Sequence, residues 1–253
     1  MKLSWVISDI LVMTKRNMLR YTRLPQLLIF STIQPVMFLL LFAYVFGGAI
    51  HTGTNYINYL IPGIIVQTVI FGSMQTGIGL ADDLSKGMID RFRSLPMARS
   101  AVLAGRTISD TMRNVFVVLL MTGVGYIIGF RFQGSILNSL AALGVTIVFG
   151  FAFSWISAFI GLLVRETETA QVAGFVWVFP LVFASSIFVP VETMPAWLQI
   201  FAKRSPITVT VNSVRALALH LDVGQNIWQS LAWVAGIILV FIPLAVHRYR
   251  KSV

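Results

Sequence analysis

Long apolar stretches separated by short polar segments dominate this sequence. They reach or approach the roughly 20 residues that an α-helix needs to cross the hydrocarbon core of a bilayer. The stretches cover residues 27–49, 59–81, 112–130, 136–164, 170–189 and 227–246. The pattern therefore predicts an all-α integral membrane protein with six transmembrane helices, in one membrane domain that covers residues 25–253. The first stretch is too long for the apolar region of a cleaved signal peptide.

Residues 1–24 have a different pattern, because their apolar side chains recur on one helical face and their charged side chains gather on the other. The apolar set is Leu3, Val6, Ile7, Ile10, Leu11, Met18 and Tyr21, and the charged set is Lys2, Asp9, Arg16, Arg20 and Arg23. We expect an amphipathic helix that lies in the membrane interface and turns at Pro25 into the first span. A plain membrane-surface anchor is the alternative.

The connection between the second and third stretches is the most informative polar segment. Leu84, Met88, Phe92 and Leu95 share a helical face, and Pro96 ends the helix. The pattern predicts a short amphipathic helix that can dock a partner. An ordinary charged loop that only fixes topology is an equally simple interpretation.

Residues 190–226, between the fifth and sixth stretches, are too long for a turn and too interrupted by prolines for another span. Ser205 and Pro206 fit an N-cap followed by the first helical position. Pro195 similarly opens a short helix, and Trp197 within it suits the headgroup depth of a membrane. We expect short helices on the outer face, acting either as a lid or in contact with substrate.

The distribution of charged residues predicts how the helices are oriented in the membrane. The chain has 57% hydrophobic and 11% charged residues, too few polar groups to cover a soluble domain, and a formal net charge of +10. Fifteen of its 19 Lys and Arg residues lie at the N-terminus, between the second and third stretches, at Arg113 where the third stretch begins, at Arg165 or after the sixth stretch. Because basic loops stay in the cytoplasm, both termini are predicted to be cytoplasmic, and the charge indicates topology rather than nucleic-acid binding.

Candidate chemistry is sparse. No apolar stretch has a charge in its middle, and the nearest acids, Asp110, Glu166 and Glu168, lie at predicted cytoplasmic boundaries, where helix capping and dipole matching explain them. We expect no catalytic, metal or cofactor residues, because the chain has no cysteine, no metal-ligand spacing and no phosphate-binding loop. Any ATP and Mg²⁺ would be bound by another polypeptide. Glutamines within the stretches either bond neighbouring helices or line a translocation path, namely Gln34, Gln67, Gln75 and Gln171.

Two segments carry a resemblance to a known family. Residues 86–99, from Lys86-Gly87-Met88 to Leu95-Pro96-Met97-Ala98-Arg99, and residues 188–198, continuing to Pro206 and Arg215, resemble the signatures of type-2 ABC exporter permeases of the daunorubicin-resistance type. The resemblance implies a permease that dimerises with a second copy and joins two ATPase subunits in the bacterial inner membrane. It also implies export of amphipathic drug-like or lipid-like molecules by alternating access.

Site residues follow from the same resemblance. It implies that an ATPase-coupling helix contains Met88, Ile89, Asp90, Arg91, Phe92, Arg93, Leu95 and Pro96, with the N-terminal helix as a connecting helix beside it. It implies an outer re-entrant segment whose motif residues are Pro190, Glu192, Pro195, Trp197, Pro206 and Arg215. An ion-coupled secondary carrier and a non-transporting membrane scaffold are the alternative functions.

Overall fold

The computed structural model describes residues 3–23, 25–50, 55–88, 91, 99–164 and 166–251, and this part of the chain contains helices and turns but no β-strand. The elements, in chain order, are α1 (Leu3–Arg23), α2 (Pro25–Leu40), the π-helix η1 (Leu41–Phe46), α3 (Tyr56–Ser85), α5 (Arg99–Ile128), α6 (Ile136–Val164), α7 (Thr167–Phe183), the 3-10 helix η2 (Val191–Thr193), α8 (Ala196–Arg204), α9 (Pro206–Ala218) and α10 (Asn226–Lys251).

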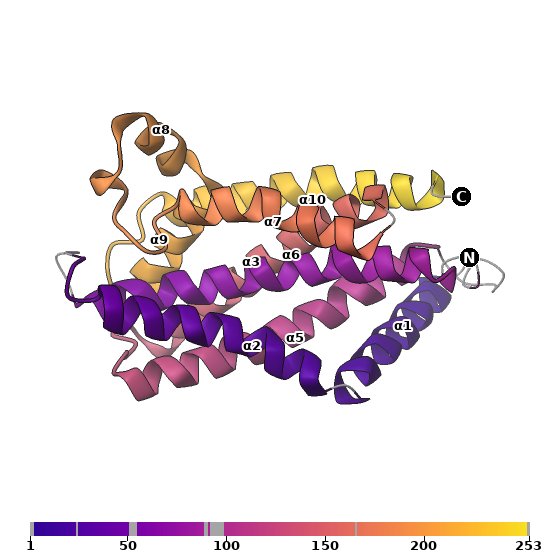
Figure 1. The fold of residues 1–253 in the computed structure, drawn as a ribbon, viewed down its shortest axis with the longest axis horizontal. Coiled ribbons are helices and arrows are strands. Elements are labelled where there is room, and N and C mark those ends of the chain that lie inside the picture. Colours follow the sequence, from indigo (N-terminus) through magenta and orange to yellow (C-terminus); the bar gives the residue numbers. More distant parts are fainter. Residues whose placement is uncertain are drawn as a thin grey trace.

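The long helices run side by side along the longest axis of the molecule (Figure 1). Both chain termini lie at one end of this bundle, here named the terminal end, and α8 lies at the opposite end, here named the cap end. Helices α3, α5, α6 and α10 are long and apolar enough to cross a membrane, whereas residues 31–46 and α7 are apolar but shorter. An all-helical membrane protein is thus confirmed, and crossing by all six predicted spans stays a prediction.

Helix boundaries agree with the sequence pattern in most places but not at α5 and α7. Helix α6 covers the same residues 136–164 as the predicted fourth span. Helix α7 ends at Phe183, before the predicted boundary at residue 189, and the chain then turns through Ser185 and Ser186. Helix α5 begins at Arg99 rather than near Met112, because the polar residues that interrupt its apolar pattern are buried against α1 and α3.

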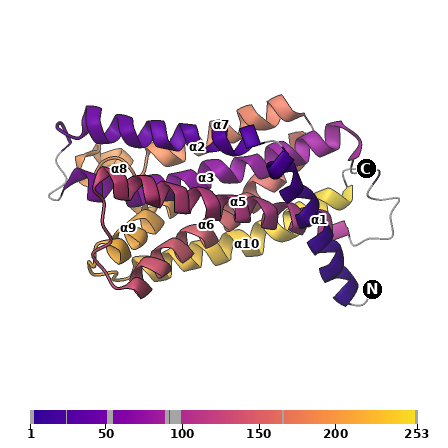
Figure 2. The same ribbon diagram turned by 90° about the horizontal axis from the view of Figure 1, so that it is seen from below.

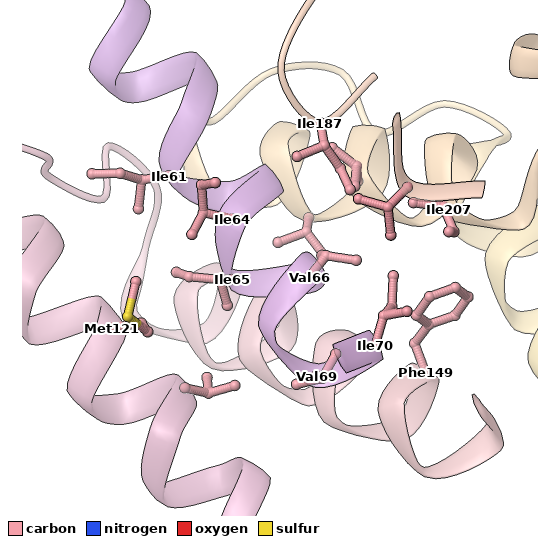
Figure 3. Close-up of a cluster of buried hydrophobic side chains, with 14 of the residues drawn as sticks. Ile61, Ile64, Ile65, Val66, Val69, Ile70, Met121, Phe149, Ile187 and Ile207 are labelled. Atoms are coloured by element: carbon pink, nitrogen blue, oxygen red, sulfur yellow. The ribbon is translucent and has the colours of Figure 1, made fainter. Parts of the chain in front are cut away.

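Helix α3 forms the centre of the bundle, and Figure 3 shows its apolar side chains meeting those of α5 and α6. Its closest neighbour is α6, which it approaches backbone to backbone. A Cβ atom on Gly77 or Gly161 would overlap the backbone of the other helix, and one on Gly150 would lie 2.7 Å from the Val69 Cβ. Gly150 and Gly161 therefore permit close packing of α6 on α3, but Gly144 has open space around it.

Helix α1 is confirmed as a helix, but its buried face differs from the predicted apolar face. It packs on α5 through Met13, Thr14, Asn17 and Tyr21, opposite Gly105, which has no side chain to prevent the approach. Figure 2 shows α1 crossing the terminal end of the bundle at an angle. Of the predicted apolar face, Ile7 is 50% and Leu11 is 63% exposed, whereas Tyr21 is buried against the bundle. Helical periodicity cannot distinguish a face that meets lipid from one that meets another helix.

Candidate functional site

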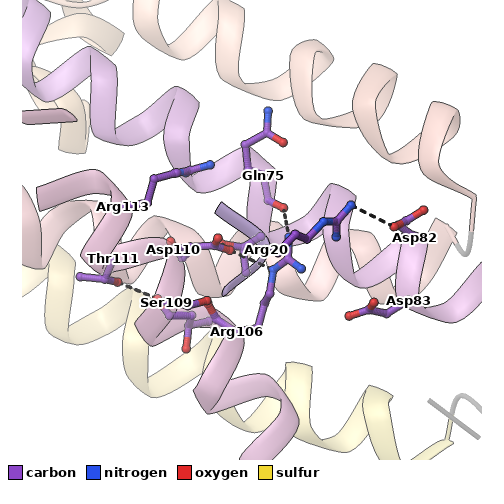
Figure 4. A network of polar contacts seen from close by, with 12 residues as sticks. Arg20, Gln75, Asp82, Asp83, Arg106, Ser109, Asp110, Thr111 and Arg113 are labelled. Atoms are coloured by element: carbon purple, nitrogen blue, oxygen red, sulfur yellow. Dashed lines mark hydrogen bonds and ion pairs between the residues drawn. The ribbon is translucent and has the colours of Figure 1, made fainter. Parts of the chain in front are cut away.

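A buried carboxylate, Asp110, organises the polar residues between α1, α3 and α5. One oxygen accepts a hydrogen bond from the Tyr21 hydroxyl at 2.5 Å, and the other accepts from the Thr76 hydroxyl at 2.7 Å and from Arg106 Nε at 3.2 Å. Figure 4 shows the Asp110 and Arg106 side chains pointing toward each other. Asp110 has no exposed surface and Arg106 is only 6% exposed. A buried ion pair is stabilised when its remaining polar atoms are also bonded, as they are here.

Two glycines of α3 provide room for the arginines of α5. A Cβ atom on Gly79 would overlap the Arg106 guanidinium group, and one on Gly72 would overlap the Asn114 side chain. Backbone carbonyls of α3 also accept hydrogen bonds from these arginines. Arg113 Nη2 donates to the Gly72 carbonyl at 2.5 Å, and Arg106 Nη2 donates to the Gln75 carbonyl at 3.2 Å. Close approach of α3 and α5 therefore depends on glycine at these positions.

Asp110 was expected to cap a helix or match its dipole, and this interpretation is wrong. Helix α5 begins at Arg99, so the residue lies inside the helix and its side chain bonds three other residues. Glu166 does precede α7 as its N-cap residue, although its side chain makes no capping hydrogen bond, and Glu168 lies in the first turn of that helix. Dipole matching explains the acids of α7 and not the acid of α5.

A second set of ion pairs joins α1 to the last turn of α3. Arg20 contacts Asp82 at 3.4 Å, Arg16 contacts Asp83 at 3.4 Å, and Lys86 contacts Asp82 at 2.7 Å. These partners lie directly before the residues predicted to form the coupling helix. The segment that would meet an ATPase is thus preceded by a part of α3 that is bonded to α1.

Most predicted coupling residues lie outside the described part of the chain, namely Ile89, Asp90, Phe92, Arg93, Leu95 and Pro96. Met88 follows the turn after α3 and is half-buried, whereas Arg91 is exposed. Gly87, just before Met88, has a φ of +63°, a conformation that glycine adopts without strain. The coupling assignment itself stays a prediction.

A cavity of about 310 Å³ lies between α1, α2, α3 and α5, in the half of α3 toward the terminal end. Its wall combines charged and amide groups with apolar side chains, among them Arg20, Gln34, Phe71, Gln75, Asp82, Arg106, Arg113, Asn114 and Val117. Two of the predicted path glutamines, Gln34 and Gln75, therefore meet at one cavity. Gln67 is buried elsewhere in α3, and Gln171 is exposed on α7 without lining the cavity.

A run of phenylalanine rings leads from this cavity toward the cap end. We name it the aromatic lane; in order it contains Phe71, Phe179, Phe183, Phe188, Phe42 and Phe46. Neighbouring ring centroids lie 4.2 to 5.5 Å apart, which is the distance of favourable ring contact. Phe179 and Phe183 are partly exposed between α2 and α7, so the lane has an open side. Its members come from four separate elements of the chain.

At the cap end, a buried arginine of α9 holds the outer segment to α3. Arg215 donates to the Tyr59 carbonyl at 3.1 Å, to the Ser186 carbonyl at 2.8 Å and to the Asn212 side chain at 2.9 Å. Its guanidinium carbon lies 3.6 Å from the centre of the Tyr59 ring. No carboxylate in the described ranges forms an ion pair with it. Carbonyl dipoles and an aromatic face therefore stabilise this charge.

The other residues of the outer motif form the expected short helices. Ser205 and Pro206 are the N-cap and first residue of α9, and Pro195 is the N-cap residue of α8. Trp197 on α8 is 73% exposed, and Glu192 lies in η2, which Pro190 precedes. The Ser205 hydroxyl makes no capping bond, so the fixed φ of Pro206 starts the helix by itself.

Sequence reasoning missed the polar residues that the fold places together at the terminal end. Tyr21 was assigned to a lipid-facing surface, and Arg106 was used only as a topology signal, yet both contact Asp110. The spacing of Arg106 and Asp110, four residues apart on one helix, was the available signal. Among the described residues, no group of three His, Asp or Glu side chains is arranged to hold a metal ion.

Comparison of the sequence with known proteins identifies the family of this chain. The family model described as ABC-2 type transporter matches residues 8–219. The chain is 37% identical over 239 residues to the daunorubicin resistance ABC transporter permease protein DrrB1 of Streptomyces coeruleorubidus, a match that covers 94% of this chain and 84% of that protein. It is 26% identical over 249 residues to the probable doxorubicin resistance ABC transporter permease protein DrrC of Mycobacterium tuberculosis, covering 97% and 90%. The chain therefore belongs to the ABC-2 type transporter family, as its two signature segments predicted.

Proposed function

We propose that this chain is the membrane-spanning permease subunit of an ATP-driven exporter that moves amphipathic drug-like or lipid-like molecules by alternating access. The observation that carries the proposal is the joining of the polar cavity to the aromatic lane through Phe71, which belongs to both. A molecule with a polar group and an apolar body finds matching surfaces for each part. Relatives named as drug resistance permeases support the same conclusion.

Power for transport would come from two separate ATPase subunits that bind ATP and Mg²⁺. The predicted docking segment, residues 86–99, follows the α3 carboxylates Asp82 and Asp83, which pair with Arg20 and Arg16 of α1. Movement of the segment by an ATPase would therefore pull on α3 and α1 together. Both helices contribute to the cavity wall, so such movement would change the shape of the cavity.

A second copy of the permease would cover the open side of the aromatic lane. The exposed apolar side chains of this face are large and lie on α2, η1 and α7; they include Met37, Leu41, Tyr44, Val45, Phe179 and Phe183. Lipid chains can solvate such a face, but a partner would also enclose the lane. The two ATPases would dock at the terminal end, so under this proposal that end lies on the cytoplasmic side of the inner membrane.

An ion-coupled carrier is the competing function, and Asp110 is the residue that favours it, because buried carboxylates bind ions or protons in such proteins. The oxygens of Asp110 already accept three hydrogen bonds, from Tyr21, Thr76 and Arg106. A carboxylate so occupied has little capacity left for a transported ion. A non-transporting scaffold would have no use for the cavity.

The experiment is ATP-dependent uptake of a fluorescent amphiphile into inside-out vesicles that contain the permease and its co-expressed ATPase. We expect uptake that requires ATP and needs no ion gradient. Phe92→Ala and Arg91→Glu should reduce both uptake and permease-stimulated ATP hydrolysis. Arg204→Glu, a charge reversal in α8 at the cap end, is the matched control and should leave both unchanged. Uptake driven by an ion gradient without ATPase would refute the proposal.

A further inference from the structure

Two buried hydrogen-bond donors in the cavity wall have no acceptor among the described residues. Arg113 Nε and Asn114 Nδ2 are both buried and unbonded, although Arg113 is only 4% and Asn114 only 3% exposed. A buried donor without an acceptor costs about 1–3 kcal/mol, and more when the group is charged. Such groups indicate a site where an acceptor from outside the chain binds.

The charge on the cavity wall identifies the kind of acceptor. Three arginines line the cavity; Arg106 pairs with Asp110 and Arg20 pairs with Asp82. Arg113 has no carboxylate within ion-pair distance in the described ranges. Its Nη2 donates to the Gly72 carbonyl and to the Asn114 side chain, and its guanidinium carbon lies 5.7 Å from the centre of the Tyr21 ring. One positive charge on the wall therefore has no directly bonded carboxylate in the described ranges. A buried cation is stabilised by an anion and penalises a second cation.

The remaining wall suits a molecule larger than a free ion. Phe71 and Val117 provide apolar surface next to the charged groups, and the amides of Gln34 and Gln75 add further hydrogen-bonding capacity. A volume of about 310 Å³ exceeds that of a single inorganic anion, and Phe71 opens the way to the aromatic lane. The two halves of the wall match the headgroup and the first methylenes of an amphiphile.

We infer that this cavity binds the anionic headgroup of an amphiphile, a phosphate monoester or carboxylate, through Arg113 and Asn114. This inference rests on the proposed function, and it makes an acidic amphiphile the preferred transported class over a cationic one. Arg113 would give the charge-assisted hydrogen bonds and Asn114 a neutral one. Arg106 and Asp110 hold the wall in place and make no direct contact with the anion.

The test is binding of fluorescent lysophosphatidic acid to the purified permease in detergent, followed by fluorescence anisotropy. Unlabelled lysophosphatidic acid should compete at least about tenfold more strongly than lysophosphatidylcholine of the same chain length, as expected for a charge-assisted hydrogen bond. Inorganic phosphate should compete only weakly, because it lacks the apolar part. Equal competition by both lysolipids, or strong competition by phosphate, would overturn the inference.

Two variants assign the binding to the cavity. Arg113→Gln should weaken lysophosphatidic acid binding about tenfold, whereas Arg204→Gln removes one charge at the cap end and should leave it unchanged. Asn114→Asp is nearly isosteric and places a carboxylate beside Arg113 Nη2, so it should also weaken binding without harming the fold. Unchanged binding in Asn114→Asp would contradict the inference even if Arg113→Gln does not fold.

The binding assay separates this inference from the proposed function because it needs neither ATPase nor vesicles. Headgroup-selective binding that depends on Arg113, found together with absent ATP-driven uptake, would keep the site and refute the exporter. ATP-driven uptake found without headgroup selectivity would keep the exporter and refute the site.

Discussion

The two ends of the bundle each contain a buried arginine that joins separate elements, but they neutralise its charge differently. At the terminal end, Arg106 pairs with Asp110, which also binds Tyr21 of α1 and Thr76 of α3. At the cap end, Arg215 binds the backbone carbonyls of Tyr59 and Ser186 and lies over the Tyr59 ring. Around Arg106 most partners are side chains, with one bond to the Gln75 carbonyl, whereas Arg215 has two backbone carbonyls and one side chain, Asn212, as acceptors.

This difference indicates different mechanical roles for the two ends. Backbone carbonyls move only when the helix or turn that carries them moves, so Arg215 fixes α9 to α3 and to the turn after α7. Side-chain partners can change rotamers, so the Asp110 network can rearrange while its helices stay folded. The exporter proposed above would be driven from the terminal end, so it would need adjustable contacts there and a firmer cap. The following predictions test this distinction, from the largest expected effect to the smallest.

Asp110→Asn should cause the largest loss of stability, about 4 kcal/mol, because it leaves the buried Arg106 without a counterion. The free energy of unfolding, measured by denaturant titration in micelles, gives the value. Arg106→Gln combined with Asp110→Asn should cost less than the sum of the single changes, since the pair is removed together. Additive effects would show that the two groups are energetically independent.

Arg215→Met should cost about 2–3 kcal/mol, because it keeps the apolar stem but removes the donors to Tyr59, Ser186 and Asn212. The loss should concentrate at the cap end, measured as faster proteolysis within residues 190–226. Arg215→Lys keeps the charge but not the forked donor geometry, so it should restore stability only in part. Full rescue by lysine would mean that charge alone matters and would remove the contrast between the two ends.

Gly79→Ala should destabilise the protein by about 1–3 kcal/mol, because the new methyl group overlaps the Arg106 guanidinium group. Gly144→Ala in α6 is the matched control, since nothing lies within 4 Å of that position. The control should be neutral or stabilising by up to about 1 kcal/mol, as alanine favours helix interiors. Thermal unfolding in detergent compares the two variants. Equal effects would argue against a steric role for Gly79.

Arg20→Gln should change stability by less than about 1 kcal/mol, because the Arg20 to Asp82 pair is partly exposed and solvent screens it. The small effect should shrink further at high salt, which chemical unfolding at two ionic strengths can measure. A loss as large as that of Asp110→Asn would show that the ion pairs between α1 and α3 are fixed structural contacts. The small energy assigned to the solvent-screened pair would then be wrong.

Much of the fold followed from local rules that need no knowledge of neighbours. The span over residues 136–164, the start of α9 at Pro206 and the short helices at the cap end come from apolar length and proline geometry. The packing of the α6 glycines does not follow from local rules. Whether Gly161 meets another helix and Gly144 meets nothing depends on the packing of α3 against α6.

The candidate site was less predictable, because its residues gather from distant parts of the sequence. Gln34 and Gln75 were named as path residues and do line the cavity, but Gln67 and Gln171 have the same pattern and do not. Asp110 was named and misinterpreted, since its partner Tyr21 lies 89 residues away. Arg113 was assigned to the cytoplasmic start of the third apolar stretch, and nothing in the sequence indicated that its Nε has no acceptor.

The sequence by itself determined the class of the protein, the order of its apolar helices and the two signature segments of its family. Apolar length, charge asymmetry and proline placement are properties of contiguous residues, so the sequence displays them directly. Tertiary structure alone decided which charges neutralise one another, which face of α1 is buried and where the cavity lies. Those features depend on contacts between helices, and periodicity reports which residues share a face but not what packs against it.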